Sequence, residues 1–169
     1  MLLCLILMTA CLKKWTVASF DISGAYLYSP IKELVLLDPP TFFLPDLEGK
    51  VLRLKKALYG IRQAGQFWWV FISIILANLG FNASEVDQYF YFFKNGGVII
   101  VIWMHVNDGP VSSNCPEAIQ NFKHMIFSQL DVKWKDSVSR IVGLECAFGE
   151  GEVTIMQQRL TNGVLDSYP

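Results

Sequence analysis

The segment that most constrains the fold is Val98–Ser113, with the sequence VIIVIWMHVNDGPVSS. Its first part, Val98–Met104, is an uninterrupted apolar run rich in β-branched side chains. Because such a run is too short for a globular helix, it predicts a strand buried on both faces. The following Asn107–Pro110 (NDGP) has residues typical of a turn, so the segment predicts a β-hairpin with two oxygen-bearing side chains at its tip.

Two interpretations of Asp108 remain open from this segment alone. A rigid hairpin that lifts a carboxylate out of an apolar sheet is suited to hold a hard cation. An Asp in a loop beside a core strand is the plainer alternative. The choice between them depends on carboxylates elsewhere in the chain. The predicted strand at Trp15–Ile22 carries one, Asp21, next to its last residue.

The rest of the chain predicts a single α+β domain over residues 1–169, because no repeat, low-complexity tract or linker divides it. We expect helices over Met1–Leu12, Arg62–Asn78 and Pro116–Leu130 and from Gln157 onward. We expect further strands over Leu34–Leu37, Tyr89–Phe93, Asp131–Trp134, Arg140–Phe148 and Glu152–Met156. On the helix at 116–130, the residues expected to face the core are Ala118, Ile119, Phe122, Met125, Ile126 and Leu130.

Composition excludes several classes of protein. Apolar residues make up 53% of the 169 residues, which argues against disorder. The four cysteines form no CxxC pair, so a zinc site is not expected. No basic residue precedes the apolar stretch of Met1–Leu12, so it does not predict a signal peptide, and we expect an intracellular protein, cytoplasmic or nuclear.

The predicted helix Phe67–Leu79 (FWWVFISIILANL) is apolar nearly all round. Ser73 and Asn78 interrupt it, and no run approaches the roughly 20 apolar residues that span a bilayer, so we expect no stable membrane insertion. A helix of this kind is either fully buried or covered by a partner, which includes a second copy of the chain.

The segment before this helix is basic. Lys50–Arg62 contains five cations and no acid. Such a run is typical of a solvated face, and it is also what a groove that follows phosphates requires. Both interpretations remain open.

Five ordered segments resemble the copia-type retrotransposon reverse transcriptases, which are part of a Pol polyprotein. They are Phe20–Leu27 (FDISGAYL), Lys55–Ala64 (KKALYGIRQA), Ser84–Tyr91 (SEVDQYFY), His105–Asp108 (HVND) and Ile141–Glu145 (IVGLE). The second is the most specific, since it looks like the family's LKKSLYGLKQAP block. His105–Asp108 stands where the family has Tyr-Val-Asp-Asp.

The resemblance implies a polymerase palm, an antiparallel sheet backed by helices with partial fingers, that acts on an RNA template and a DNA primer. In this family two Mg²⁺ (or Mn²⁺) ions about 3.5–4 Å apart activate the 3′-hydroxyl and stabilise the pyrophosphate leaving group. Asp21 and Asp108 would be metal ligands and, with Asn107, would form the catalytic set.

The resemblance also assigns nucleotide and nucleic-acid contacts. Tyr26 falls where the family places an aromatic residue that blocks a ribose 2′-hydroxyl. Gly60 and Gln63 lie where the incoming nucleotide is positioned. The cations of the same block would contact phosphates or only line its rim; they are Lys55, Lys56 and Arg62.

Departures from the family pattern predict impaired chemistry. Asn107 replaces the first Asp of the pair, and a neutral amide cannot neutralise two dications. His105 replaces the family's Tyr, and Gly65 replaces the Pro of the KQAP block. The chain is also expected to be truncated at both ends relative to the family. We therefore predict a degenerate reverse transcriptase domain, an RNA-directed DNA polymerase by descent in which one catalytic carboxylate is replaced.

Two hypotheses of other classes compete with this one. The first is a non-catalytic protein that keeps the palm to bind RNA or an RNA–DNA hybrid, with salt-sensitive binding as its signature. The second is an interaction or membrane-surface protein built on the apolar helix Phe67–Leu79.

Overall fold

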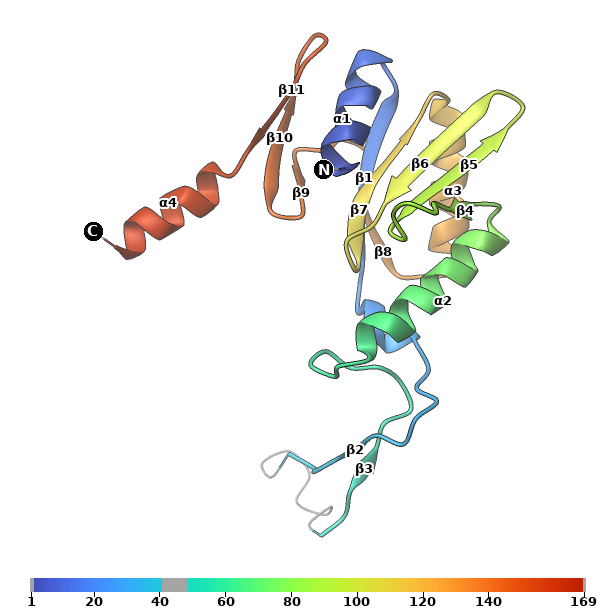
Figure 1. Ribbon diagram of the computed structural model, residues 1–169, viewed down its shortest axis with the longest axis vertical. Helices are drawn as coiled ribbons and strands as arrows, with labels where there is room; N and C mark the ends of the chain where they lie inside the picture. Colours follow the sequence, from blue (N-terminus) through green and yellow to red (C-terminus); the bar gives the residue numbers. More distant parts are fainter. Residues whose placement is uncertain (1, 41–48, 169) are drawn as a thin grey trace. The chain divides into compact units, whose positions relative to one another are not determined.

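The computed structural model describes residues 2–40 and 49–168 and has the predicted α+β class (Figure 1). The chain forms two compact units, one of Met1–Ser23 with Ile75–Pro169 and the other of Gly24–Ile74. The helices are α1 (Leu2–Leu12), α2 (Ala64–Asn78), α3 (Pro116–Phe127) and α4 (Gln158–Ser167), with a short 3₁₀ helix η1 (Ala25–Tyr28).

The first unit is built on a six-stranded antiparallel sheet in the order β4-β5-β6-β7-β1-β8 (Figure 1). Its strands are β1 (Thr16–Ile22), β4 (Asn82–Ala83), β5 (Phe90–Asn95), β6 (Val98–Trp103), β7 (Asp108–Ser113) and β8 (Val132–Lys135). Gly96 and Gly97 both have positive φ in the two-residue β5–β6 loop, as a type I′ turn requires. The antiparallel, palm-like sheet confirms the predicted fold class.

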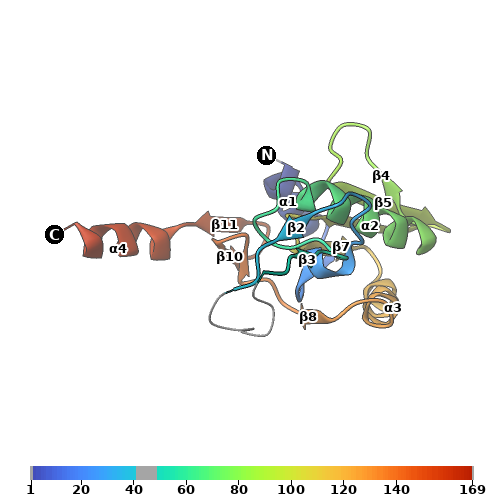
Figure 2. The same cartoon turned by 90° about the horizontal axis from the view of Figure 1, so that it is seen from below.

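Helices α1 and α3 cover opposite faces of this sheet (Figure 2). Successive side chains of a strand point to opposite faces. On β1, Val17 packs against the apolar cluster that contains Leu7 of α1, whereas Phe20 contacts Phe122 of α3 at a ring-centroid distance of 6.3 Å. Asp21 shares the face of Val17, so the site face is the face of α1.

An aromatic cluster holds α3 against the sheet. The side chain of Phe122 is fully buried, and its ring lies 5.2 Å from that of Phe81 and 6.2 Å from that of Trp134, centroid to centroid. Trp134 also stacks on Phe20 at 6.2 Å. Because Trp134 belongs to the edge strand β8, this packing fixes β8 beside β1.

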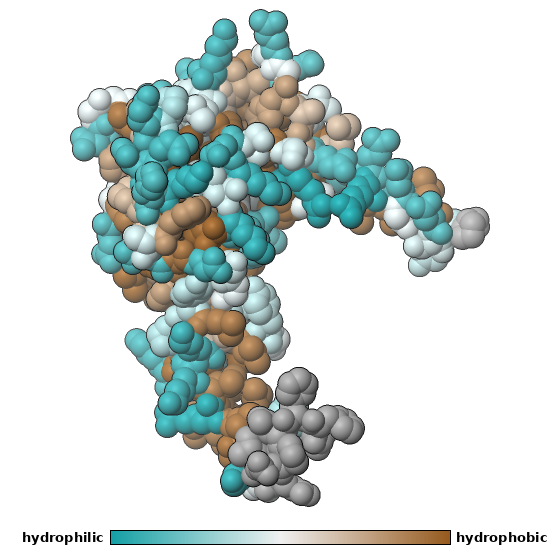
Figure 3. Space-filling model, turned by 180° about the vertical axis from the view of Figure 1, so that it is seen from behind, coloured by the Kyte–Doolittle hydropathy of each residue, from teal (hydrophilic) through white to brown (hydrophobic). Residues whose placement is uncertain are grey.

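A second, three-stranded sheet in the order β11-β10-β9 packs on α1 through a cluster that includes Leu3, Leu7, Ile141 and Cys146. Its strands are β9 (Arg140–Ile141), β10 (Leu144–Phe148) and β11 (Val153–Met156). Helix α4 follows and has no buried residue. Its apolar side chains Leu160, Val164 and Leu165 are exposed, and Figure 3 shows apolar residues among polar ones on the surface of this helix.

The second unit holds η1, the two-stranded sheet of β2 (Leu36–Leu37) and β3 (Leu52–Arg53), and the first part of α2. Every fourth residue of α2 is buried, namely Ala64, Trp68, Ile72 and Leu76.

The opposite side of α2 is exposed, with Ile74 at 56% and Val70 at 44%. Of the two alternatives for this helix, full burial does not hold, and cover by a partner or a second copy stays a prediction. Within the described ranges, no helix is both long and apolar enough to cross a membrane.

Three sequence expectations need correction. Pro110 does not end the ladder: β7 begins at Asp108 and is a central strand, and only Val106 and Asn107 form the loop. Met125 is 38% exposed because it lies outside the stripe of α3 that faces Phe122. The apolar run of Met1–Leu12 is typical of a buried helix, but this first helix is only half buried, since its outer side carries exposed apolar residues, which are Leu5, Met8 and Leu12.

The register explains why Pro110 is tolerated. The Ile22 N–H donates to the Asn107 carbonyl at 2.7 Å, and hydrogen-bonded and non-hydrogen-bonded pairs alternate along antiparallel strands. Pro110, paired with Ser19, therefore turns its nitrogen away from β1 and toward β6. The β6–β7 ladder has already ended at the Ile102–Val111 pair, so no ladder hydrogen bond is lost.

Candidate active site

The two predicted carboxylates face each other across adjacent strands. Asp21, near the end of β1, pairs in register with Asp108, the first residue of β7. The neighbouring Ile22–Asn107 pair is hydrogen-bonded, so Asp21–Asp108 is a non-hydrogen-bonded pair, the type with the closer side chains. The Cβ atoms of such pairs lie about 4.5–5.5 Å apart. The sheet thus brings together two acids that are far apart in sequence.

The hairpin tip is closed by backbone hydrogen bonds between its flanking residues. The His105 N–H donates to the Asp108 carbonyl at 2.7 Å, and the Asp108 N–H donates back to the His105 carbonyl at 3.2 Å. Val106, the first loop residue, has a φ of 58°. A β-branched residue in this region is strained, so the two flanking hydrogen bonds hold the tip in a conformation that Val106 itself disfavours.

Gly109 allows β7 to approach the end of β6 closely. A Cβ atom built on Gly109 would lie 1.9 Å from the backbone oxygen of Trp103. No side chain fits that space, and the obstacle is backbone rather than a movable side chain. Glycine at this position therefore allows the backbone next to Asp108 to lie against the end of β6.

Asn107 is bound to Asp21. The Nδ2 group of Asn107 donates a hydrogen bond to Oδ1 of Asp21. An ionised carboxylate only accepts hydrogen bonds, so the amide must present its nitrogen to Asp21 and turn its oxygen elsewhere. Asn107 thus stabilises the Asp21 carboxylate through a hydrogen bond from a neutral group.

The pKa of Asp108 departs from its ordinary value. Burial raises the pKa of its carboxyl above the ordinary Asp value, and the nearby negative charge of Asp21 raises it further. The Val142 N–H, 3.4 Å from Oδ2 of Asp108, and the charge of His105 act in the opposite direction but do not cancel the rise in pKa. The carboxyl is therefore held in a partly dry environment.

The acid pair opens into a pocket of about 410 Å³, here called the Asp21 pocket. Strands β1, β7 and β8 form its floor, and β9 with the turn after it forms its wall. Its lining residues are Ser19, Phe20, Asp21, Asp108, Gly109, Lys133, Lys135, Arg140, Ile141, Val142 and Gly143. A pocket of this volume suits a small ligand or a short length of a polymer.

Three cations of this pocket were missed by the sequence reasoning: Lys133, Lys135 and Arg140. A sequence signal existed, since the alternation of apolar and basic residues in Val132–Lys135 (VKWK) predicts one basic face. No local pattern predicts which strand β8 pairs with, and therefore which side chains lie beside its basic face. Because β8 pairs with β1, Lys133 lies opposite Asp21 and Lys135 opposite Ser19.

The residues predicted to contact nucleotide all lie in the second unit. Tyr26 in η1 packs on the ring of Tyr59 at a centroid distance of 4.4 Å. Gly60 has a φ of 92°, and Nε2 of Gln63 donates to Glu33 at 3.2 Å.

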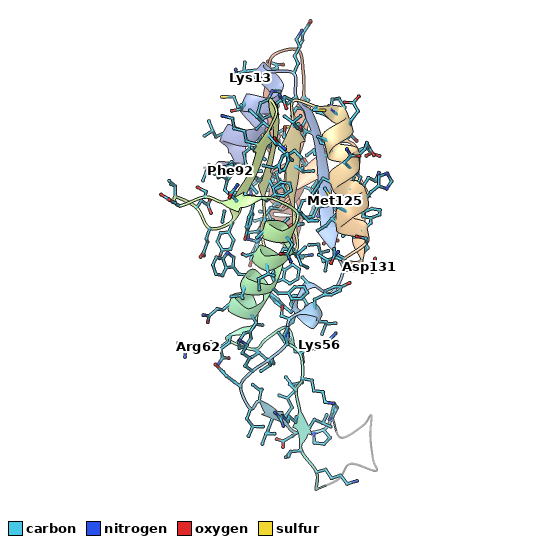
Figure 4. All side chains as sticks on the ribbon, turned by 90° about the vertical axis from the view of Figure 1, so that its right-hand side faces the viewer. Lys13, Lys56, Arg62, Phe92, Met125 and Asp131 are labelled. Atoms are coloured by element: carbon cyan, nitrogen blue, oxygen red, sulfur yellow. The ribbon has the colours of Figure 1, made fainter. Side chains whose placement is uncertain are left out.

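The predicted phosphate contacts Lys55, Lys56 and Arg62 are exposed and lie in the chain between β3 and α2; Figure 4 labels Lys56 and Arg62. The Ile31 N–H donates to the Lys55 carbonyl at 3.1 Å. The backbone at Lys55 is thereby fixed against the strand-like segment that begins at Pro30, which also bridges to Lys56.

With this geometry in place, comparison of the sequence with protein families is decisive. Residues 2–168 match the family described as Reverse transcriptase (RNA-dependent DNA polymerase). The chain belongs to this reverse transcriptase family.

Curated relatives agree with this assignment. The chain is 27% identical over 134 residues to the Retrovirus-related Pol polyprotein from transposon RE1 of Arabidopsis thaliana. This alignment covers 79% of the chain and 9% of the relative. It is 25% identical over 154 residues to the Retrovirus-related Pol polyprotein from transposon RE2 of the same plant. This alignment covers 90% of the chain and 11% of the relative. The chain therefore spans about a tenth of these relatives. No solved structure matches. The predicted resemblance to copia-type reverse transcriptases is confirmed.

Members of this reverse transcriptase family generally use divalent metal ions, so the donor set must be tested against them. Two carboxylates face each other, but the third position, Asn107, offers an amide nitrogen that is already bound to Asp21. Within residues 2–40 and 49–168, no three His, Cys, Asp or Glu side chains gather as a metal site. Three cations line the same pocket. This set does not fit a pair of divalent ions.

Proposed function

We propose that this chain is a reverse transcriptase domain whose nucleotidyl transfer is impaired by Asn107. The proposal rests on one observation: the amide of Asn107 donates to Asp21 at the place where the resemblance expects a metal-bridging carboxylate. Asp21 and Asp108 would be the remaining metal ligands. RNA template and DNA primer are the substrates that the family implies.

The size of the impairment follows from charge. A site for two dications needs negative charge from its ligands, and an amide oxygen contributes none. Loss of one charged ligand costs several kcal/mol of stabilisation, or on the order of 10³-fold in rate. Lys133, Lys135 and Arg140 add positive charge beside the ligands and increase this cost.

Primer extension tests the proposal. The purified chain is given a primer–template and deoxynucleotides with Mg²⁺ or Mn²⁺, beside Asn107→Asp and the double variant Asn107→Asp with Asp21→Ala. We expect no extension by the unmodified chain, a gain with Asn107→Asp, and loss of that gain in the double variant. Extension by the unmodified chain that Asp21→Ala abolishes would contradict the proposal.

A second candidate function is non-catalytic binding of RNA or an RNA–DNA hybrid. The observation that favours it is the exposed basic segment of the second unit, with Lys55, Lys56 and Arg62. Its signature is affinity that falls as salt rises. Binding of a labelled hybrid that is unchanged when all three residues are replaced by Gln would count against this segment as the binding surface.

A further inference from the structure

Helix α4 gains no buried residue from the rest of the described chain. All of its 10 residues are at least partly exposed, and its N-cap residue, Gln157, makes no side-chain capping hydrogen bond. An isolated helix shorter than about 12–15 residues is marginal in water, because most helix stability in proteins comes from the packing of an apolar face. Figure 2 shows α4 extending away from the β9-β10-β11 sheet. Contact with a further molecule would therefore stabilise this helix.

One side of α4 is suited to such a contact. Four residues recur at i, i+3, i+4 and i+7, the spacing of one helix face, and are here called the α4 stripe: Leu160, Gly163, Val164 and Ser167. All four line a groove of about 650 Å³ between α4 and the β9–β10 turn. Leu160 is 61% exposed and Val164 is 52% exposed. The groove thus leaves the apolar side chains of the stripe accessible.

The two small residues of the stripe fit the approach of a second helix. Glycine is less favourable than alanine inside a helix, yet a Cβ atom built on Gly163 meets no neighbouring atom within 4 Å. The described chain therefore does not require glycine here, whereas a small residue lets two helix axes come close. The Ser167 hydroxyl donates to the Gly163 carbonyl at 2.7 Å. Because that hydroxyl is already hydrogen-bonded within α4, covering it leaves no donor unsatisfied.

Opposite charges flank the stripe on one side. Arg159 and Asp166 are seven residues apart, close to two helical turns, so they lie on the same flank of α4. Both line a second groove, of about 500 Å³, that Gly163 also borders. Among residues 2–40 and 49–168, the single ion pair within 4.0 Å is Lys123–Asp136, so neither charge is paired in its own chain. This flank carries a cation near the start of the helix and an anion near its end.

That order of charges is self-complementary. In a two-fold symmetric dimer, residue i of one copy contacts residue j of the other, and j contacts i. When two α4 helices pair antiparallel, Arg159 of each copy meets Asp166 of the other, twice in the dimer. A parallel pair would bring like charges together, which is unfavourable. The charges therefore favour a second copy of the same helix in the antiparallel orientation.

We infer that α4 is a self-association surface: it pairs antiparallel with α4 of a second copy of this chain, with the α4 stripe at the centre and two Arg159–Asp166 ion pairs at the flank. One pair of short helices buries less than the roughly 1,200 Å² of a standard interface, so the dimer is weak, with Kd on the order of 10–100 μM. The inference does not rest on the proposed chemistry of Asp21 and Asp108.

Sedimentation equilibrium of the full chain tests the dimer across about 1–300 μM, which brackets the expected Kd. Leu160→Gln removes one leucine of the stripe from each copy and should raise Kd at least about 10-fold. Leu165→Gln is the matched control, because Leu165 is exposed to nearly the same degree, 63% against 61%, but lies off the stripe. The control should leave Kd within about twofold of that of the unmodified chain.

Charge reversal tests the orientation of the two helices. Arg159→Asp turns two attractive contacts in the dimer into repulsive ones and should raise Kd about 5- to 30-fold, and Asp166→Arg should do the same. The double variant restores opposite charges in reversed order, so its Kd should return to within about threefold of that of the unmodified chain. Added salt should shrink the effects of the single variants, because the charges are exposed. Circular dichroism of each variant checks that the fold is retained.

Three results would overturn the inference. The first is a chain that stays monomeric over the whole range of concentration. The second is a dimer that Leu160→Gln and Leu165→Gln weaken equally, or that only Ile74→Gln in α2 weakens, since either would place the interface elsewhere. The third is a double charge variant that dimerises as weakly as the single ones. None of these depends on primer extension, so failure here is distinct from failure of the proposed function.

Discussion

The hydrogen bond from Asn107 to Asp21 can be tested by converting the amide to an acid. In metal-free buffer, Asn107→Asp removes a hydrogen bond to a charged group, worth about 1.5–3 kcal/mol. It also places a second carboxylate against Asp21, and two like charges about 4 Å apart repel by about 4 kcal/mol at an effective dielectric constant of 20. Protonation of the new acid relieves part of this repulsion.

We therefore expect the metal-free variant to lose about 3 kcal/mol in the free energy of unfolding. In a chain of 169 residues this lowers Tm by about 6–12 °C. The variant has three acids in place of two, so Mg²⁺ should stabilise it, by about 2.7 kcal/mol at a concentration one hundred times Kd. The unmodified chain should show little response to Mg²⁺.

Urea and thermal unfolding followed by circular dichroism, with and without Mg²⁺, measure both effects. Asn121→Asp makes the same charge change at an exposed position of α3 and serves as the control. Equal stability of Asn107→Asp and the unmodified chain in EDTA, together with no gain from Mg²⁺, would refute the contact between Asn107 and Asp21 as described.

Three further predictions concern stability and are measured by urea unfolding. Burial raises the pKa of Asp108 in the folded state, so ionisation of this carboxyl destabilises the fold as pH rises from the ordinary Asp pKa through the raised one. Asp108→Asn should therefore have a higher free energy of unfolding than the unmodified chain at about pH 7, and the difference should disappear by about pH 3. Gly109→Ala should cost about 3 kcal/mol or more because its Cβ meets backbone, whereas Gly65→Ala, in open space on α2, should stabilise by about 0.5–1 kcal/mol. Phe122→Ala should cost about 3–5 kcal/mol, and Phe127→Ala, with 44% exposure, much less. Equal effects within either pair, or a less stable Asp108→Asn at neutral pH, would contradict the packing and burial on which these values rest.

Local patterns predicted most elements because they depend on neighbours in sequence. Apolar runs and the spacing of apolar residues in the predicted helix 116–130 were sufficient to place most of the strands and α3 within a few residues. The errors arose where a residue's environment is set from outside its own element. Met125 has the right residue type for a core but lies beyond the stripe that the sheet covers, and Pro110 is allowed in a central strand only because the ladder on its far side has ended.

The sequence by itself determined the candidate acids Asp21 and Asp108, the substitution at Asn107 and the family that these motifs resemble. Only the tertiary structure decided that Asp21 and Asp108 face each other in a non-hydrogen-bonded pair, and that β8 lies on the other side of β1. Strand order and register come from long-range pairing and the packing of α3, which no local pattern encodes. For that reason the amide bound to Asp21 and the cations beside it became visible only in the folded chain.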